Sequence, residues 1–512
     1  MSETLPSSWA LPELQHVAEI GPKFNAGDLP GQEPVHFVPM AAVAENFGGV
    51  DVSRLRPLSE VRKGYTFFAE GDVLFAKITP CMENGKGALV PHLERSHAFG
   101  STEFHVLRPS EAVAGEWLAH FLSQPSFRKT ARHNMTGTAG QLRVPTKWLQ
   151  TVRMPAPPRA EQTRIVAKLE ELLSDLDAGV AELKTAQKKL QQYRQSLLKA
   201  AVEGALTAPW REAQRKLGTP TETGAQLLQR ILTERRARWE AKQLAKFKEQ
   251  GKAPPKDWQK KYPEPVQPDT TDLPELPEGW VWASVEQLGN VTTGFTPSTT
   301  DAENFGGAVP FFKPSDLDAG YSVIAARDYL TEKGASAGRV LPALSVLVTC
   351  IGATIGKTGL ARVACTTNQQ INSISVDPDS AVPEFIFWFM NSGLGQRQIV
   401  NSASATTLPI LNKSRFQRLA VPLPSRAEQQ EMVRCIDAEV ERCTQLAVSL
   451  NLSLKQSTAQ RQNILRAAFA GQLVPQDPND EPASVLLARI RAELASQAAQ
   501  KKPRARKARE AA

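Results

Sequence analysis

The chain repeats itself, and this internal repeat restricts its possible folds more than any other feature of its 512 residues. From Pro155 and Pro422 onward the two copies align without a gap, so matched residues differ by 267 in number, the difference between 155 and 422. The preserved matches are residues 159–162 with 426–429, Ala200-Ala201 with Ala467-Ala468, Gly204 with Gly471, and Leu206 with Leu473. Self-similarity at so long a period indicates a duplicated structural unit.

Upstream of the two preserved blocks, residues 1–157 and 277–424 match each other only through short motifs. These are Leu5-Pro6-x-x-Trp9 with Leu276-Pro277-x-x-Trp280, Val73-Leu74-Phe75 with Val346-Leu347-Val348, and Glu116-Trp117-Leu118 with Glu384-Phe385-Ile386. The two upstream blocks diverge, whereas the two preserved blocks that follow them stay alike. This contrast indicates two versions of one recognition unit, each attached to the same kind of scaffold.

The preserved blocks predict two long helices, over residues 158–205 and 425–472. Ser425-x-x-Glu428 predicts a capping box, in which the serine hydroxyl accepts an N–H and the glutamate side chain reaches back. Pro158 has the matching position in the first copy, where proline suits a first helical turn. Gly204 and Gly471 are placed where a left-handed C-cap is expected.

Apolar positions in both helices recur in a four-three rhythm, which predicts a narrow seam and therefore a coiled coil. The seam residues are Leu169, Leu173, Leu176, Val180, Leu183, Leu190, Leu197 and Ala201 in the first helix, and Ile436, Val440, Cys443, Ala447, Leu450, Leu454, Ile464 and Ala468 in the second. Each helix would be about 68 Å long at 1.5 Å per residue. The connector permits parallel or antiparallel pairing, and we favour antiparallel pairing because it gives both copies equivalent surroundings.

The expected fold class is α+β: two mixed α/β domains, related by a pseudo-two-fold axis, separated by an antiparallel coiled coil of the two preserved helices. In each divergent block, β-rich runs over 73–78 and 346–351 precede one amphipathic helix, over 116–123 and 384–391. The connector, residues 206–276, holds a charged helix over 226–249 and then a proline-rich stretch. Residues 473–512 hold a last helix and a basic tail.

Composition excludes several classes of protein. Hydrophobic residues make up 41% and charged residues 22% of the chain, which is ordinary for a globular protein and excludes a disordered or collagen-like one. No apolar run approaches the roughly 18 residues of a membrane span, and the first residues do not resemble a secretory signal. We therefore expect a cytoplasmic protein whose five cysteines are reduced thiols. A net charge of +8 is compatible with binding nucleic acid but does not prove it.

Loops of both divergent blocks carry Thr, Asn, Gln, Lys and Arg, the side chains that hydrogen-bond to base edges and phosphates. The candidates for such contacts are Lys77, Thr79, Asn84, Lys86, Arg143 and Lys147 in the first block, and Lys313, Thr354, Lys357, Asn412 and Lys413 in the second. For each of them the alternative is an ordinary solvated loop. The cations of the tail, Lys501, Lys502, Arg504, Arg506, Lys507 and Arg509, form a phosphate-binding cluster or a frayed, solvated end.

Motifs for catalysis are missing from the sequence. The run from Ile351 to Thr358 is one residue short of the phosphate-binding G-x4-G-K-[ST] pattern. All histidines lie between His16 and His133, so histidine chemistry is not a task that the two copies share. His92, His97 and Cys81 fit no common zinc spacing. We find no nucleophile elbow, no adenine-methyltransferase motif and no glycine-rich S-adenosylmethionine loop, and we expect no catalytic or metal-binding residues.

The sequence resembles the specificity subunit of type I restriction–modification systems over nearly its whole length. The motifs that carry the resemblance are Leu5-Pro-x-x-Trp9, Leu276-Pro-Glu-Gly-Trp280, Phe37-Val-Pro-Met40, Gly71-Asp-Val-Leu-Phe-Ala-Lys-Ile-Thr79, Pro422-Leu-Pro-x-x-x-Glu428-Gln429, and Ile464-Leu-Arg-Ala-Ala-Phe-Ala-Gly-Gln-Leu473. Two features depart from a simple duplication: Ser345 stands where the first copy has Asp72, and the charged helix of the connector has no counterpart in the second copy other than residues 483–496.

The resemblance implies two target-recognition domains, each reading one half of a bipartite, asymmetric double-stranded DNA site. It implies that the paired helices fix the distance between the half-sites, and that two modification subunits, which bind S-adenosylmethionine and methylate adenine, dock against them. Restriction subunits that hydrolyse ATP would complete the assembly. The chain itself would hold no cofactor, with S-adenosylmethionine, ATP and magnesium on the partner subunits.

Two other classes of function stay open at this point. The chain could be a coiled-coil scaffold with two protein-binding heads, or an enzyme whose site is not recognisable from the sequence. Sequence-specific retention of DNA by the assembled complex would exclude the scaffold, and DNA modified or cut by the chain alone would indicate the enzyme.

Overall fold

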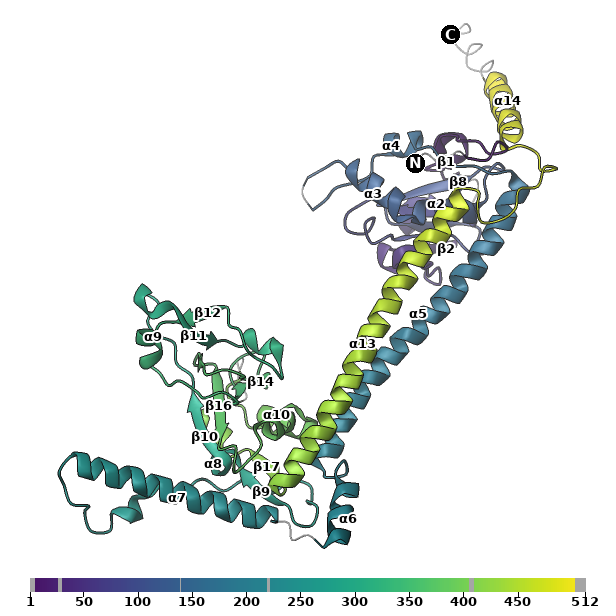
Figure 1. Ribbon diagram of the computed structural model, residues 1–512. Helices are drawn as coiled ribbons and strands as arrows, with labels where there is room; N and C mark the ends of the chain where they lie inside the picture. The colour runs from purple at the N-terminus through teal and green to yellow at the C-terminus, as the bar shows by residue number, and fades with distance from the viewer. Residues whose placement is uncertain (1–4, 26–29, 139, 219–221, 405–408, 502–512) are drawn as a thin grey trace. The chain divides into compact units, whose positions relative to one another are not determined.

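The computed structural model describes residues 5–25, 30–138, 140–218, 222–404 and 409–501, which form two compact units. Unit 1 comprises residues 1–184 and 451–512, and unit 2 comprises residues 185–450. The boundaries between the units fall within the two longest helices, which therefore contribute to both (Figure 1). The basic tail beyond Lys501 lies outside the described residues, as does the side chain of Lys501 itself.

Unit 1 contains two four-stranded sheets. The first has the order β1-β8-β5-β6 and is antiparallel throughout. The second has the order β3-β2-β7-β4, and its central pair, β2 and β7, is parallel. The strands are β1 (Ala18–Ile20), β2 (Pro34–Val38), β3 (Leu55–Pro57), β4 (Thr66–Phe68), β5 (Val73–Ala76), β6 (Gly87–Leu89), β7 (Ala98–Gly100) and β8 (Phe104–Pro109).

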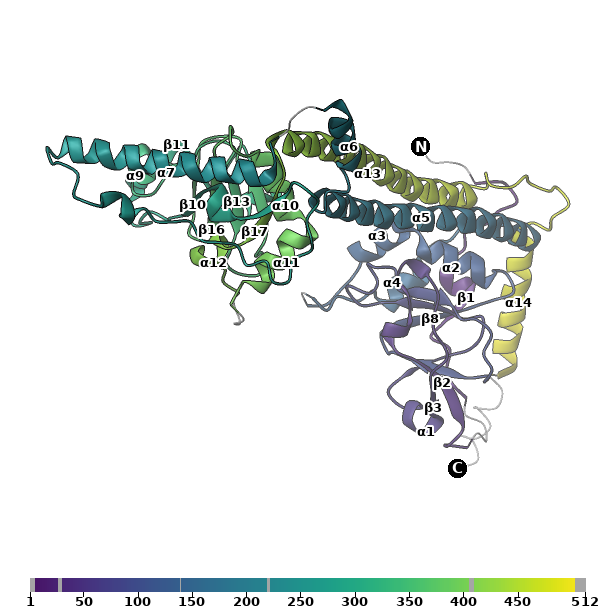
Figure 2. The ribbon, with the colours of Figure 1, turned by 90° about the horizontal axis from the view of Figure 1, so that it is seen from below.

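The helices of unit 1 pack on both sheets and on the long helices. They are α1 (Leu58–Val61), α2 (Gly115–Ser123), α3 (Pro125–His133), α4 (Thr146–Thr151) and α14 (Ala483–Lys501), with parts of α5 (Arg159–Val202) and α13 (Arg426–Phe469). Helix α2 lies between the long helices and the first sheet (Figure 2). Its Trp117 ring packs against Phe469 of α13, with the ring centroids 4.0 Å apart and the ring planes tilted by 30°. The main core of unit 1 therefore includes residues from both ends of the sequence.

Unit 2 repeats the first sheet of unit 1 and adds smaller ones. Its antiparallel four-stranded sheet has the order β10-β16-β13-β14 and is accompanied by a three-stranded sheet, β12-β11-β15, and a pair, β17-β9. The strands are β9 (Val281–Ser284), β10 (Gly289–Thr293), β11 (Phe305–Phe312), β12 (Asp328–Leu330), β13 (Val346–Thr349), β14 (Thr358–Leu360), β15 (Thr366–Thr367), β16 (Ile371–Val376) and β17 (Ala420–Leu423).

The helices of unit 2 include one that the divergent blocks share and two that only the connector supplies. Helix α10 has the place in unit 2 that α2 has in unit 1, whereas α6 and α7 belong to the connector. The helices are α6 (Ala208–Leu217), α7 (Gly224–Glu249), α8 (Val285–Leu288), α9 (Glu332–Ser336), α10 (Pro383–Asn391), α11 (Gly393–Asn401) and α12 (Lys413–Gln417), with parts of α5 and α13. The predicted α+β class, with mixed domains and a long helix pair, is confirmed.

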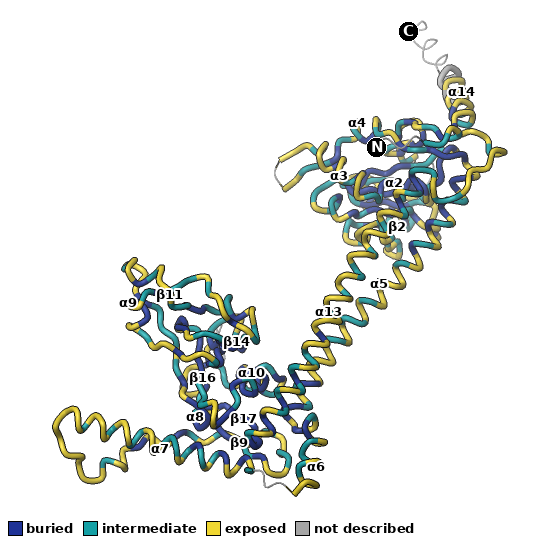
Figure 3. Tube along the Cα trace, viewed as in Figure 1, coloured by how far each residue is buried: buried dark blue, intermediate teal, exposed yellow. Residues whose placement is uncertain are grey.

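The long helices pair in antiparallel fashion within each unit, as predicted. In unit 1, Arg461 of α13 donates to Asp177 of α5 over 2.7 Å. In unit 2, the Tyr193 hydroxyl of α5 donates to Glu439 of α13 over 3.1 Å. Every predicted seam residue is buried or half-buried, and no residue of α5 between 174 and 196 is fully buried (Figure 3). The seam is therefore narrow, as the four-three rhythm requires.

The helix ends are confirmed in part. Gly204 and Gly471 adopt φ of +76° and +72°, the left-handed conformation predicted for them. The backbone N–H of Glu428 donates to the Ser425 hydroxyl over 3.2 Å, so the first half of the capping box is present. The second half was predicted wrongly, because the Glu428 carboxylate is turned away and accepts hydrogen bonds from Trp280, Thr207 and Arg211.

Candidate nucleic-acid interface

A tryptophan clamp attaches the first divergent block to the helix ends in unit 1. The indole N–H of Trp9 donates to Glu161 Oε2 over 3.0 Å, and the Gln476 amide donates to Glu161 Oε1 over 2.6 Å. Burial raises the pKa of Glu161, since the donors that face it are neutral. Pro6 lies so close to Gly471 that a Cβ there would be 2.5 Å from the proline Cγ. This packing explains why the Leu-Pro-x-x-Trp motif accompanies the glycine.

Unit 2 contains the same clamp with stronger donors. The indole N–H of Trp280 donates to Glu428 Oε2 over 3.0 Å, and the Thr207 hydroxyl donates to Glu428 Oε1 over 2.6 Å. The Arg211 guanidinium forms an ion pair with the same oxygen and also donates to the Gly204 carbonyl over 2.7 Å. In each unit, therefore, the tryptophan motif of the divergent block is held by the glutamate that begins one preserved helix, beside the glycine that ends the other.

The glutamine next to each glutamate makes a second attachment. Gln162 accepts the Ala114 N–H over 2.8 Å just before α2 and donates to the carbonyls of Ala112 and Pro157. Gln429 accepts the Val382 N–H over 2.9 Å just before α10. Both glutamine side chains are fully buried. The repeated Glu-Gln pair thus fixes both the tryptophan motif and the amphipathic helix of its block, roles that sequence reasoning missed.

The departure at Ser345 is matched by a change in its partner. In unit 1 the buried Asp72 carboxylate accepts two hydrogen bonds of 2.8 Å from Arg108 on β8. In unit 2 the Ser345 hydroxyl pairs with the Ser375 hydroxyl on β16 over 2.7 Å. An ion pair has been exchanged for a hydroxyl pair, so the difference leaves the sheet intact.

Three of the candidate residues in the first block come together beyond the end of β5. The backbone N–H of Thr79 donates to Leu142 over 3.0 Å, and the Lys77 carbonyl accepts the Val144 N–H over 2.8 Å, which places Arg143 beside both. The Arg143 guanidinium donates to both oxygens of Glu103 and holds the pKa of that carboxyl below its usual value, with Lys77 contributing. The Thr79 hydroxyl is buried and has no hydrogen-bond partner among the described residues.

The other three candidates of the first block lie apart from this group. The Asn84 amide donates to Glu45 over 2.7 Å, and the Lys86 ammonium donates to the Met40 carbonyl over 3.2 Å. Lys147 is exposed on α4, and no carboxylate of the described residues pairs with it.

Four of the five candidates in the second block come from two adjoining segments. The loop between β13 and β14 carries Thr354 and Lys357, and the turn that begins α12 carries Asn412 and Lys413. Hydrogen bonds from Gly352 N–H to Pro409 and from Leu411 N–H to Cys350 join the segments. The pattern matches unit 1, where the 79–86 loop is joined to residues 142–144. Asn412 also caps α12 by accepting the Arg415 N–H over 2.9 Å.

Lys313, the fifth candidate, follows β11 in the three-stranded sheet and pairs with Asp328 over 2.6 Å. Lys357 pairs with Asp318, also over 2.6 Å. Exposed ion pairs of this kind contribute only about 0–1 kcal/mol, so a phosphate or base edge can compete for these cations. Which candidates contact DNA stays a prediction.

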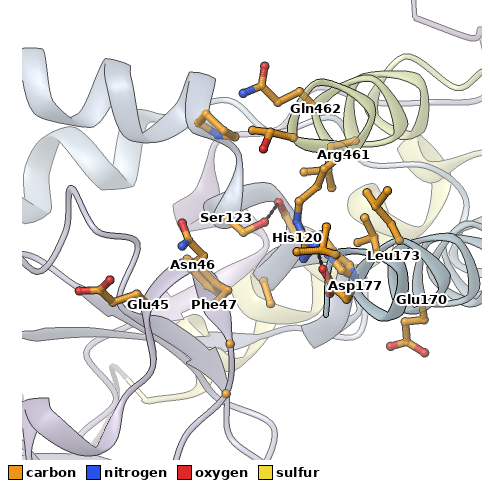
Figure 4. Close-up of a pocket in the computed structure, with 18 of the residues that line it drawn as sticks. Glu45, Asn46, Phe47, His120, Ser123, Glu170, Leu173, Asp177, Arg461 and Gln462 are labelled. Atoms are coloured by element: carbon orange, nitrogen blue, oxygen red, sulfur yellow. Dashed lines mark hydrogen bonds and ion pairs between the residues drawn. The ribbon is translucent and has the colours of Figure 1, made fainter. Parts of the chain in front are cut away.

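Unit 1 also has a groove between its divergent block and the helix pair, with a volume of about 870 Å³ (Figure 4). His120 of α2 and Arg461 of α13 line it, with Asn46 and Phe47 opposite. Burial, and secondarily the charge of Arg461, lowers the pKa of His120 to about 4. The imidazole is therefore neutral at pH 7.

At the matching positions of unit 2, larger side chains replace Ala119 and His120. They are Phe387 and Trp388, and Tyr321 stacks on Trp388 with ring centroids 4.9 Å apart. The Trp388 indole and the Tyr321 hydroxyl both donate to Asp437 of α13, over 3.0 and 2.7 Å. The two units therefore share their sheet and clamps, but they differ in the side chains that face α13.

The second block and its helix match a known protein family. Residues 277–456 match the family described as "Type I restriction modification DNA specificity domain". These residues are therefore similar to a type I specificity domain. The resemblance stated from the sequence is thereby confirmed for residues 277–456, and unit 1 repeats the sheet and the clamps of this matched segment.

The curated relatives of this chain are also specificity subunits of type I restriction enzymes. The EcoAI specificity subunit of Escherichia coli is 31% identical over 311 residues, which cover 57% of this chain and 52% of the relative. The EcoEI specificity subunit of Escherichia coli is 30% identical over 315 residues, which cover 57% of this chain and 53% of the relative. The chain thus spans about half the length of these two relatives. The EcoDI specificity subunit of the same species is 22% identical over 430 residues, or 85% of its length.

Solved structures share the fold of the matched segment and of the rest of the chain. A chain from work on complex assembly and conformational transition of the type I R-M system superposes with a TM-score of 0.65 at 20% identity, covering 92% of this chain and 99% of that one. The HsdS subunit of Thermoanaerobacter tengcongensis gives a TM-score of 0.53 with the same identity and coverage. Among the described residues, no helix is both long and apolar enough to cross a membrane.

Proposed function

We propose that this chain is the DNA-recognition subunit of a type I restriction–modification complex. It reads a bipartite, asymmetric site and directs adenine methylation and restriction that its partner subunits carry out. The observation that carries the proposal is the pair of matched clamps: Glu161-Gln162 and Glu428-Gln429 hold two divergent blocks to one frame in the same way. A common frame with unlike surfaces suits a protein that reads two different half-sites.

Each block reads its half-site through the joined loops beyond its central strand. In the first block these loops carry Lys77, Thr79 and Arg143, and in the second they carry Thr354, Lys357 and Lys413. Arg and Lys recognise guanine, Asn recognises adenine, and each good bidentate contact discriminates by about 1–3 kcal/mol. Three or four such contacts per block are enough for specificity.

The helix pair sets the distance between the half-sites and receives the modification subunits. Half-sites about 10 bp apart present the same groove to both blocks. Exposed apolar side chains on α13, such as Leu446 and Val448, support docking of a partner, since 55% and 64% of their surfaces are exposed.

The chemistry belongs to the partners. Methylation requires the adenine to be extruded from the duplex, and we assign that step, with S-adenosylmethionine, to the modification subunits. ATP and magnesium are assigned to the restriction subunits. This chain contributes recognition and spacing and is not itself catalytic.

The experiment is methylome sequencing of a host that carries the system, with and without this gene. Adenine methylation at one bipartite motif should disappear with the gene and return when the gene is restored. A methylome that is the same in both strains would contradict the proposal. DNA modified or cut by the purified chain alone would show an enzyme instead, and a complex without sequence preference for DNA would favour a scaffold.

As a finer test, Lys77→Ala and Lys413→Ala should each lower methylation at the motif, because both residues lie on the joined loops. Lys63→Ala, at an exposed lysine outside both the joined loops and the helix pair, serves as the matched control.

A further inference from the structure

The connector between the two copies forms an arm that none of the recognition chemistry uses. Helix α7 extends from the body of unit 2, and residues 250–262 fold back along it (Figure 1). Trp239 stacks on Trp258 with ring centroids 5.7 Å apart, and Tyr262 and Phe247 pack edge-on against these two rings. The returning segment is therefore held against the helix, and the arm is a defined element rather than a loose linker.

The base of the arm is anchored by apolar residues and arginines. Leu227 and Ile231 are buried in the main core of unit 2. Arg235 donates to the carbonyls of Glu286 and Gly289 over 2.7 and 3.1 Å, and Arg238 pairs with Asp377 over 2.6 Å. The arginines of α7 are thus engaged in holding the arm in place.

The outer part of the arm presents lysines instead. All seven are exposed: Lys242, Lys246, Lys248, Lys252, Lys256, Lys260 and Lys261. In the described part of the chain, Lys260 alone among them has a carboxylate partner, Asp257 at 3.2 Å. Residues 224–262 contain eleven Lys and Arg against four Asp and Glu, a net charge of +7, whereas the whole chain carries +8. The arm is thus one of two basic concentrations in the sequence, the other being residues 501–512, with six Lys and Arg against one Glu.

We propose that the arm binds the sugar-phosphate backbone of duplex DNA outside the recognised half-site, independently of sequence. The inference rests on the proposed function, which brings DNA to unit 2, and it adds a contact outside both divergent blocks. Lysine carries a compact charge without fixed geometry, which suits phosphates at any sequence. Each phosphate that the arm neutralises releases counterions and adds affinity that salt weakens.

An acidic protein surface is the competing partner, and the side chains of the arm argue against it. Protein interfaces are enriched in aromatic residues and arginine and depleted in lysine. Here the arginines are anchored, the aromatic rings of Trp239 and Trp258 pack on each other, and Leu244 is the one large apolar side chain exposed in the described part of the outer arm. The surface left for a partner is charged and almost without apolar area.

The test replaces the six lysines that have no carboxylate partner, at positions 242, 246, 248, 252, 256 and 261, with glutamine in the full chain co-purified with its modification subunits. The matched control replaces the same six with arginine, which keeps the charge. Affinity is measured between 50 and 200 mM salt for a duplex with the mapped methylation site and for one with both half-sites scrambled. Hydrogen exchange in α7 verifies that the arm stays folded.

If about three of the lysines reach phosphates, the slope of log affinity against log salt should become shallower by about 3, with a loss of roughly 10²-fold at 0.1 M salt. Both duplexes should weaken by the same factor, and the arginine variant should bind like wild type. An unchanged slope, or a loss confined to the specific duplex, would overturn the proposal. Loss of the modification subunits with DNA affinity intact would assign the arm to an acidic protein. Failure of the proposed function would be visible separately, as a wild-type complex that does not distinguish the two duplexes.

Discussion

The two clamps offer a comparison within one molecule, because Glu→Gln can be made at Glu161 or at Glu428. At Glu428 the change removes the charge that faces Arg211, whose side chain is only 20% exposed against 5% for the glutamate. Breaking a buried ion pair costs about 3–5 kcal/mol, and the partial exposure of Arg211 puts the expected loss near 3 kcal/mol. At Glu161 the donors are neutral and Gln476 is exposed, so the loss should be about one hydrogen bond, or 1 kcal/mol.

The burial of Glu161 also predicts a small loss at this clamp. Its raised pKa means that the negative charge destabilises the folded protein, and glutamine removes that charge. Hydrogen exchange of peptides around Trp9 and around Trp280 measures the two anchors separately. Protection should fall by roughly 10²-fold around Trp280 in the Glu428 variant but only about 5-fold around Trp9 in the Glu161 variant. Adding Arg211→Met to the Glu428 variant should restore part of the protection. Equal losses at the two anchors would refute this reasoning.

The helices and their ends were predictable because their signals are local. The four-three rhythm fixes the seam, and Gly204 and Gly471 mark C-caps within the segment that they end. The capping box at Ser425 failed for the opposite reason. The same Ser-x-x-Glu spacing is present, but Thr207 and Trp280, more than a hundred residues away in sequence, compete successfully for the Glu428 side chain. Local sequence cannot reveal such partners.

For the candidate interface, too, the sequence predicts local features but not the contacts between distant residues. The sequence identifies polar loops, and the structure joins the loops that carry Thr79 and Arg143, yet nothing in the pattern indicates that Glu103 pairs with Arg143. The exchange of Asp72 for Ser345 looks like a lost interaction until strand register shows that its partner has changed as well. Both facts depend on contacts between strands that are distant in sequence.

Three further predictions concern the frame. Gly204→Ala should destabilise the protein more than Gly218→Ala in urea denaturation: both glycines have positive φ, but only at Gly204 would a Cβ meet another atom, 2.5 Å away in Pro277. Lowering the pH from 7 to 5 should cost about 2 kcal/mol through His120, whose folded pKa of about 4 lies below its usual 6.5. This contribution is complete above pH 6.5 and is lost as the pH falls toward 4, and thermal melts of His120→Gln should lack it. Inserting one heptad near Leu183 should change the spacer length of the methylated motif. An unchanged spacer would show that the helices do not set the distance between the half-sites.

The central claim is that two unlike blocks on one frame each read one half of a DNA site. The most direct measurement is methylome sequencing after residues 1–157 are exchanged for the corresponding block of a related specificity subunit. Our account predicts that one half of the methylated motif changes while the other half and the spacer stay as they were. A motif altered in both halves, or in neither, would contradict it.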